Sequence, residues 1–164
     1  MTAVASVNGG GESRPAVTDR LGEVAHAGLR GTIAAMAMTG MRAFTVHARL
    51  VEETPPQAIF RQRASGLIGR LPRAQRRAAI ELAHWTYGAG GGVTFGLLPD
   101  GLRRRAWAGP AYGLGVWLGF ELGIAPALGL SQAGRKRPAE RAALAADHLL
   151  YGLVLSEMRR RPRE

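Results

Sequence analysis

The chain has 164 residues, enough for one domain, and it has a formal net charge of +10 and no cysteine. The lack of cysteine excludes disulfides, thiolate metal sites and a cysteine nucleophile. Almost all the basic residues are arginines, with Lys136 as the only lysine, and they lie in clusters between apolar runs. This spacing is typical of the segments that flank membrane helices, although the mean hydropathy of -0.04 is low for a membrane protein.

The N-terminal region is polar and rich in glycine, and it lacks the basic start and apolar core of a secretory signal. We expect residues 1–25 to form a disordered tail. The first apolar segment follows at residues 26–46, where Arg30 and Arg42 lie near its two ends. We predict a membrane helix whose two arginines extend their long stems toward the lipid head groups.

A polar connection follows, and Pro55-Pro56 within it ends any helix at or before Thr54. Beyond the prolines, apolar residues alternate with arginines: Ile59, Phe60, Leu67, Ile68 and Leu71 with Arg61, Arg63 and Arg70. This pattern predicts a short amphipathic helix, which lies either on a membrane surface or in solvent.

The second apolar segment, residues 78–98, has glycines at every fourth position: Gly88, Gly92 and Gly96. Each would cost a soluble helix about 1 kcal/mol relative to alanine. In a bilayer the backbone must satisfy its own hydrogen bonds, so the segment stays helical and the glycine stripe lets another helix approach closely. We predict a membrane helix with a packing seam.

Two further apolar segments cover residues 107–130 and 142–158, and a basic tail at 159–164 follows them. Pro126 is expected to kink the first of these. The same small-residue spacing recurs in them, at Gly115, Gly119 and Gly123, at Gly109 and Gly113, and at Gly152 with Ser156. The expected fold is therefore all-α, a four-helix transmembrane bundle over residues 26–158 with Gly-x-x-x-Gly seams.

The motif His84-x-x-Tyr87-Gly88 recurs as His148-x-x-Tyr151-Gly152. In each copy the glycine follows the histidine by four residues on the same helix face, which directs both histidines into the bundle. Glu121 and Asp147 are the other candidates within the predicted spans, where ionisable groups indicate function by default. The histidines either join helices by hydrogen bonds, which we favour, or form a polar path.

The motifs of common enzymes are absent, since the chain has no Gly-x-Ser-x-Gly, no phosphate-binding loop and no His-Glu-x-x-His. We therefore predict no catalytic residue, no metal site and no cofactor. A metal site would need both histidines and a carboxylate at short range.

Several short motifs occur in a fixed order along most of the chain: Glu53-Thr-Pro55-Pro56-x-x-Ile59, His84-x-x-Tyr87-Gly88, Ala111-Tyr112-Gly113-Leu-Gly-Val-Trp117, Pro126-Ala-Leu-Gly-Leu130 and His148-x-x-Tyr151-Gly152. Together they resemble the YagU-like family, small bacterial inner-membrane proteins of unknown function. The resemblance implies four membrane helices and an inner-membrane location, and it provides no catalytic residue.

The leading hypothesis is a non-enzymatic, multi-pass membrane protein with a structural or accessory role in the cell envelope, whose partner is the lipid bilayer. The glycine seams are equally compatible with a homo-oligomer or a membrane-protein partner. One alternative is a small channel or carrier with a polar or proton path through His84, Glu121 and His148. Another is a soluble, basic, helical nucleic-acid-binding protein, which the glycine stripes disfavour.

Overall fold

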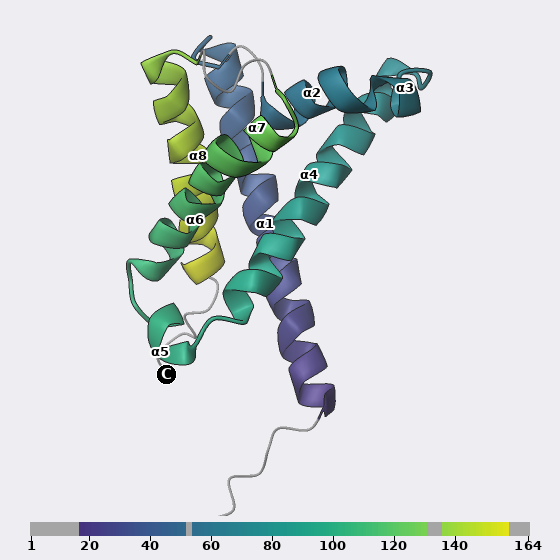
Figure 1. Cartoon of the computed structure of the whole chain (residues 1–164). Helices are drawn as coiled ribbons and strands as arrows, with labels where there is room; N and C mark the ends of the chain where they lie inside the picture. Colours follow the sequence, from purple (N-terminus) through teal and green to yellow (C-terminus); the bar gives the residue numbers. More distant parts are fainter. Residues whose placement is uncertain (1–16, 52–53, 131–135, 158–164) are drawn as a thin grey trace, which may run out of the picture.

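The computed structural model describes residues 17–51, 54–130 and 136–157, and all secondary structure in these residues is helical. The long helices are α1 (Val17–His47), α4 (Arg73–Gly96), α6 (Ala108–Gly119) and α8 (Pro138–Glu157) (Figure 1). The prediction of an all-α fold is confirmed. The short elements are α2 (Pro55–Ile59), η1 (Phe60–Ala64), α3 (Ser65–Ile68), α5 (Asp100–Arg103), η2 (Phe120–Ile124) and α7 (Ala125–Ala127).

Helix α1 begins at Val17, so residues 17–25 are helical and the predicted disordered tail is too long at its C-terminal end. The stretch contains no proline, so no residue in it interrupts a helix. Residues 1–16 and the basic tail at 159–164 lie outside the described residues.

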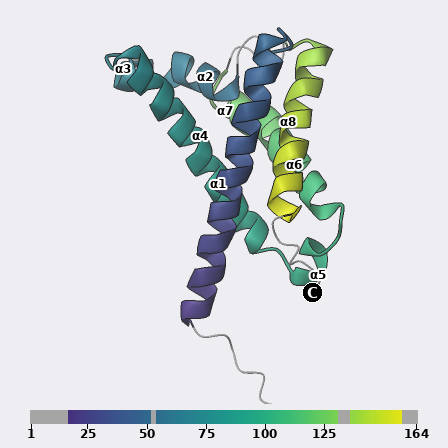
Figure 2. The same ribbon diagram turned by 180° about the vertical axis from the view of Figure 1, so that it is seen from behind.

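The helices pack in a chain of neighbours rather than as a closed square. Helix α1 packs against both α4 and α8, and α8 packs against α6. Both views show α4 leaning away from α6 toward one end of the molecule (Figure 1; Figure 2). A cavity of about 340 Å³ lies among the four long helices and is lined in part by Tyr87, Tyr112 and Tyr151.

Glycine determines how closely α1 crosses α4. A methyl group added at Gly31 of α1 would lie 2.8 Å from the Cα of Gly92 in α4. A methyl group at Gly88 would lie 2.5 Å from the Cβ of Ala35, and one at Gly96 would lie 2.6 Å from the Cβ of Ala27. The stripe Gly88, Gly92 and Gly96 therefore faces α1, and the two backbones touch.

The crossing of α6 and α8 also depends on glycine, at Gly109, Gly113 and Gly152. A methyl group on Gly109 would lie 2.6 Å from the Cβ of Ser156, and one on Gly113 would lie 3.1 Å from the backbone nitrogen of Gly152. The other predicted stripe of this region, Gly115, Gly119 and Gly123, has no atom within 4 Å of the added methyl positions. Within the described residues, α6 therefore packs through Gly109 and Gly113 rather than through that stripe.

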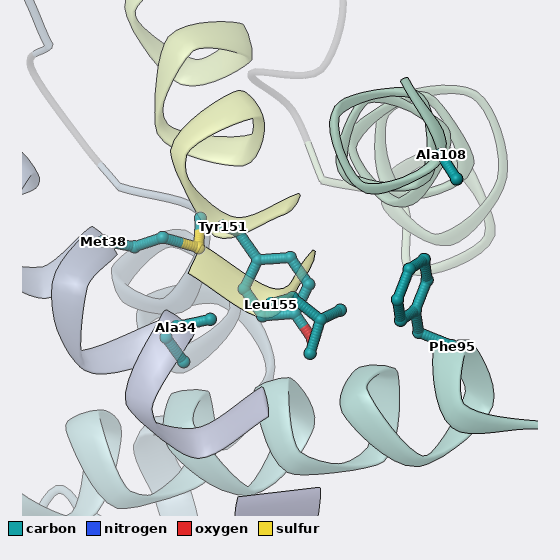
Figure 3. Close-up of a cluster of buried hydrophobic side chains, with 7 residues drawn as sticks. Ala34, Met38, Phe95, Ala108, Tyr151 and Leu155 are labelled. Atoms are coloured by element: carbon teal, nitrogen blue, oxygen red, sulfur yellow. The ribbon is translucent and has the colours of Figure 1, made fainter. Parts of the chain in front are cut away.

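The apolar core lies where α1, α4, α6 and α8 meet, and it includes Phe95, Tyr151 and Leu155 (Figure 3). The Tyr151 hydroxyl donates to the carbonyl oxygen of Gly88 at 2.7 Å, and the Tyr112 hydroxyl donates to that of Gly91 at 2.7 Å. These tyrosines thus link α8 and α6 to the backbone of α4, the helix that leans away from them.

The expected amphipathic segment is present as α2, η1 and α3, which extend sideways at one end of the bundle (Figure 1). Pro55 is the first residue of α2, a position where proline is favourable. The arginines of the segment, Arg61 and Arg63, are exposed, whereas Ile59, Phe60 and Ile68 line a cavity against α4.

Pro126 is preceded by the π-helical turn η2. Proline has no amide hydrogen and its ring displaces the carbonyl one turn earlier, and a wider turn accommodates both effects. The expected disturbance of this helix is therefore spread over Phe120–Ile124.

The outer surfaces of the helices are markedly apolar. On α1, Leu29 is 58% exposed, Ile33 37%, Met36 42% and Phe44 65%. Leu82, Leu118, Leu122 and Leu153 are also exposed. No helix of the described residues is both long enough and apolar enough to traverse a bilayer.

Candidate functional site: a buried polar cluster

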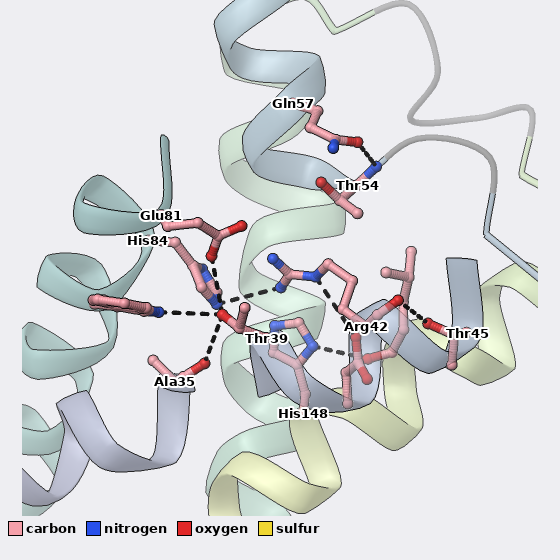
Figure 4. Close-up of polar contacts among 12 residues, drawn as sticks. Ala35, Thr39, Arg42, Thr45, Thr54, Gln57, Glu81, His84 and His148 are labelled. Carbon is pink, nitrogen blue, oxygen red and sulfur yellow. Dashed lines mark hydrogen bonds and ion pairs between the residues drawn. The ribbon is translucent and has the colours of Figure 1, made fainter. Parts of the chain in front are cut away.

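Three of the four predicted polar residues surround one arginine inside the bundle. His84 comes from α4, and Asp147 and His148 come from α8, while Arg42 reaches them from α1 (Figure 4). The fourth, Glu121, lies in η2 and pairs elsewhere. Three helices therefore bring charged and imidazole groups together in an otherwise apolar interior.

Arg42 is only 7% exposed. Its Nη2 lies 3.3 Å from Nε2 of His84, and its Nε lies 3.9 Å from Oδ2 of Asp147. The expectation that its stem extends to the lipid head groups is therefore wrong, because the residue lies on the inner face of α1 and finds a carboxylate there.

The ion pair between Arg42 and Asp147 is incompletely satisfied. Asp147 is 1% exposed, and neither of its carboxylate oxygens has a hydrogen-bond donor among the described residues. The Nε of Arg42 likewise has no hydrogen-bond partner there. A buried charge pair needs good geometry and further hydrogen bonds to offset its desolvation, and this pair lacks the further hydrogen bonds. Removal of either charge would leave the other buried without compensation, which would destabilise the fold.

The hydrogen bonds determine which nitrogen of each histidine donates. An arginine has only donors, so Nε2 of His84 accepts from Arg42 and its Nδ1 carries the proton. His148 Nδ1 lies 2.8 Å from the carbonyl oxygen of Leu144, which can only accept. Neutral His148 therefore has Nε2 as an acceptor. Both rings carry their proton on Nδ1, and the nitrogen left for a further partner is the donor Nδ1 in His84 and the acceptor Nε2 in His148.

Glu121 forms an ion pair with Lys136, the only lysine of the chain. The two side chains are 10% and 8% exposed, so the pair is nearly enclosed. It lies within electrostatic range of His148. The predicted set of His84, Glu121 and His148 is thus brought into one region, in which Arg42 contacts His84 and Lys136 compensates the charge of Glu121.

A second polar thread adjoins the cluster and was not expected. The indole Nε1 of Trp85 donates to the hydroxyl oxygen of Thr39 at 3.1 Å, and that hydroxyl donates to Oε2 of Glu81 at 3.0 Å. Thr39 precedes Arg42 by almost one helical turn, and Trp85 follows His84 directly. The contact between α1 and α4 is therefore apolar at the glycines and polar at this end.

The cluster also borders a cavity of about 310 Å³ between α2–α3, α4 and η2. Arg42, His84 and His148 lie on its wall, together with apolar side chains such as Phe60 and Ile124. In the described part of the chain, no group of three or more metal-ligating side chains is arranged to bind a metal ion. The site therefore offers hydrogen bonding, charge and apolar surface.

No family model matches the chain, and neither a curated protein nor a solved structure matches it significantly. The resemblance to the YagU-like family stays a prediction.

Proposed function

We propose that the chain is an integral protein of a bacterial inner membrane, with a structural or accessory role rather than an enzymatic one. The observation that supports this most is the distribution of side chains on α1. Leu29, Ile33 and Phe44 are exposed, whereas Arg42 is buried. This is the arrangement expected when the surrounding medium is apolar and the charges are compensated inside.

Two buried ion pairs lower the mean hydropathy of the helices. Arg42 is paired with Asp147, and Glu121 is paired with Lys136. A mean hydropathy taken along a helix includes Arg42, Glu121 and Asp147, although these side chains are buried or nearly enclosed. The backbone contacts at Gly31, Gly92 and Gly152 are of the kind that joins helices where no hydrophobic effect drives association.

The proposal is tested by fractionation of expressed protein followed by an alkaline carbonate wash. Retention in the washed membranes is the expected result. Release into the supernatant contradicts the proposal, and salt-sensitive retention on DNA would then support the nucleic-acid alternative.

A matched pair of variants makes the test sharper. Ile33→Lys puts a charge in the middle of the outer apolar face of α1, which costs about 2.5–3.5 kcal/mol at a bilayer centre. Leu21→Lys puts the same charge outside the expected span, on a side chain that is 65% exposed. We expect only Ile33→Lys to reduce membrane retention, whereas equal behaviour of the two variants would contradict insertion of α1.

A polar or proton path is the second candidate function, because His84, His148 and Arg42 converge beside the Glu121–Lys136 pair. A path predicts that proteoliposomes containing the protein acidify faster under a pH gradient than empty ones. It further predicts that His84→Gln and His148→Gln abolish this difference without changing helix content. A purely structural role predicts the opposite pattern, with no transport in any variant and lower stability in the glutamine variants.

A further inference from the structure

The cavity between α2–α3, α4 and η2 combines an apolar wall with one fixed charge. Among the described residues that line it, Arg42 is the only one that is permanently charged. Its volume of about 310 Å³ is at the lower end of the range of ligand sites. The wall includes Ile59 and Phe60 from the amphipathic segment and Ile80 from α4. An apolar body with one polar end matches this composition.

The orientation of Arg42 indicates which end of its guanidinium meets the cavity. Its Nε faces Asp147, which is not a lining residue, whereas its Nη2 contacts His84, which is. The Nη end is therefore the donor available to a bound group. Arginine is well suited to a carboxylate, since its parallel N–H groups match the two oxygens.

His148 also lines the cavity and adds an acceptor. Because its Nδ1 is engaged by the Leu144 carbonyl, Nε2 is left to accept a proton or an O–H hydrogen bond. A carboxylic acid supplies both functions: its proton passes to Nε2 of His148, and the oxygens of the resulting carboxylate accept hydrogen bonds from Arg42 and from the protonated imidazole. A quaternary ammonium group supplies neither.

We propose that this cavity binds a fatty acid, with the carboxyl group at Arg42 and His148 and the acyl chain between the amphipathic segment and α4. This goes beyond the proposed membrane role and does not depend on it, because the cavity is a feature of the fold alone. The amphipathic segment forms one wall of the site. Its apolar face therefore packs against the bound acyl chain as well as against α4.

The test is native mass spectrometry of the full chain purified in a neutral maltoside detergent, with a set of C12 amphiphiles. We expect one bound dodecanoate per chain, and at least roughly tenfold weaker binding of dodecanol and dodecyltrimethylammonium, as expected for the loss of a charged hydrogen bond. Equal binding of all three would show partition into the apolar surface and would overturn the proposal. Binding of dodecyl phosphate but not of dodecanoate would overturn the assignment of a carboxyl head group.

Two variants locate the binding. Ala83 is exposed and lines the cavity, so Ala83→Phe fills it without disturbing the core, whereas Ala78→Phe places the same ring on α4 away from the cavity wall. We expect dodecanoate binding to be lost only in Ala83→Phe, and binding unchanged by that variant would contradict the site. In Arg42→Gln/Asp147→Asn, which removes both charges of the buried pair, the preference for dodecanoate over dodecanol should disappear.

If the double variant loses helical structure, His148→Leu tests the contact with the carboxyl head group instead. This variant should lower dodecanoate affinity more than dodecanol affinity, because it removes a charged hydrogen bond from the first and a neutral one from the second. Retention of the full preference for dodecanoate would contradict the assignment. Membrane fractionation of wild-type protein is measured independently, so failure of the membrane proposal and failure of this one are distinguishable.

Discussion

Replacement of Gly92 by alanine tests the close crossing of α1 and α4 most directly. The new methyl group would lie 2.7 Å from the Cα of Gly31 and 2.8 Å from its backbone nitrogen. Ordinary carbon contacts are about 3.5–4.0 Å, so the helices must separate by roughly 1 Å at this point. The obstructing atoms are backbone atoms, which a rotamer change cannot move.

Overpacking of this kind typically costs about 1–3 kcal/mol, and separation of the helices also loosens the packing around Phe95. The matched control is Gly90→Ala, two positions earlier in the same helix, where the added methyl group meets no atom within 4 Å. This control removes the same glycine penalty without a clash. We expect it to leave stability unchanged or to raise it by up to about 1 kcal/mol.

The assay is thermal or denaturant unfolding of the purified chain, followed by far-ultraviolet circular dichroism, with wild type and the two variants in the same detergent or buffer. The expected order of stability is Gly90→Ala at or above wild type, with Gly92→Ala below it. If Gly92→Ala is as stable as Gly90→Ala, then α1 and α4 do not cross at Gly31 and Gly92, and the reasoning from close backbone contact fails.

Three other predictions follow from the packing and the buried charges. Arg42→Met and Asp147→Leu should each lower the free energy of unfolding by about 3–5 kcal/mol, because each leaves one buried charge without its partner, whereas the double variant should recover most of this loss. Denaturant unfolding of the four proteins checks this, and additive losses would show that the two charges do not interact. Gly109→Ala should destabilise the crossing of α6 and α8 by about 1–3 kcal/mol, with Gly115→Ala neutral or stabilising in the same thermal assay. Tyr151→Phe should cost about 1 kcal/mol, since it removes a buried hydrogen bond to the backbone of α4, and a change near zero in the unfolding free energy would show that this bond does not hold α4 in place.

Glycine spacing in the sequence identifies one seam well and another poorly. Gly88, Gly92 and Gly96 face α1, but Gly115, Gly119 and Gly123 have the same spacing and face open space. The period of four specifies that residues share a helix face, and it contains no information on where the partner helix lies. Gly109 and Gly113 have that spacing too and lie on the face that meets α8, so only tertiary structure distinguishes the two stripes of this helix.

The ion pair of Glu121 and Lys136 could not be derived from local patterns. The two residues are 15 positions apart, and the connection between η2 and α8 determines whether they meet. In the sequence, Glu121 lies within a predicted span as a candidate polar residue, and its side chain is 10% exposed in the structure. Its partner lies in a basic loop that the composition assigned to the membrane flank.

Arg42 is a different case, because the sequence contained a signal for its burial. Ala35, Met38 and Arg42 follow at intervals of three and four residues, so they share one face of α1, and Gly31 continues that face toward the N-terminus. The first three are 0%, 2% and 7% exposed. The prediction for Arg42 rested on its position near the helix end and not on the face that it shares with Ala35 and Met38. An arginine on a packing face needs an anion inside the bundle. The sequence offers more than one, Glu121 as well as Asp147, so the choice of Asp147 follows only from how α8 packs against α1.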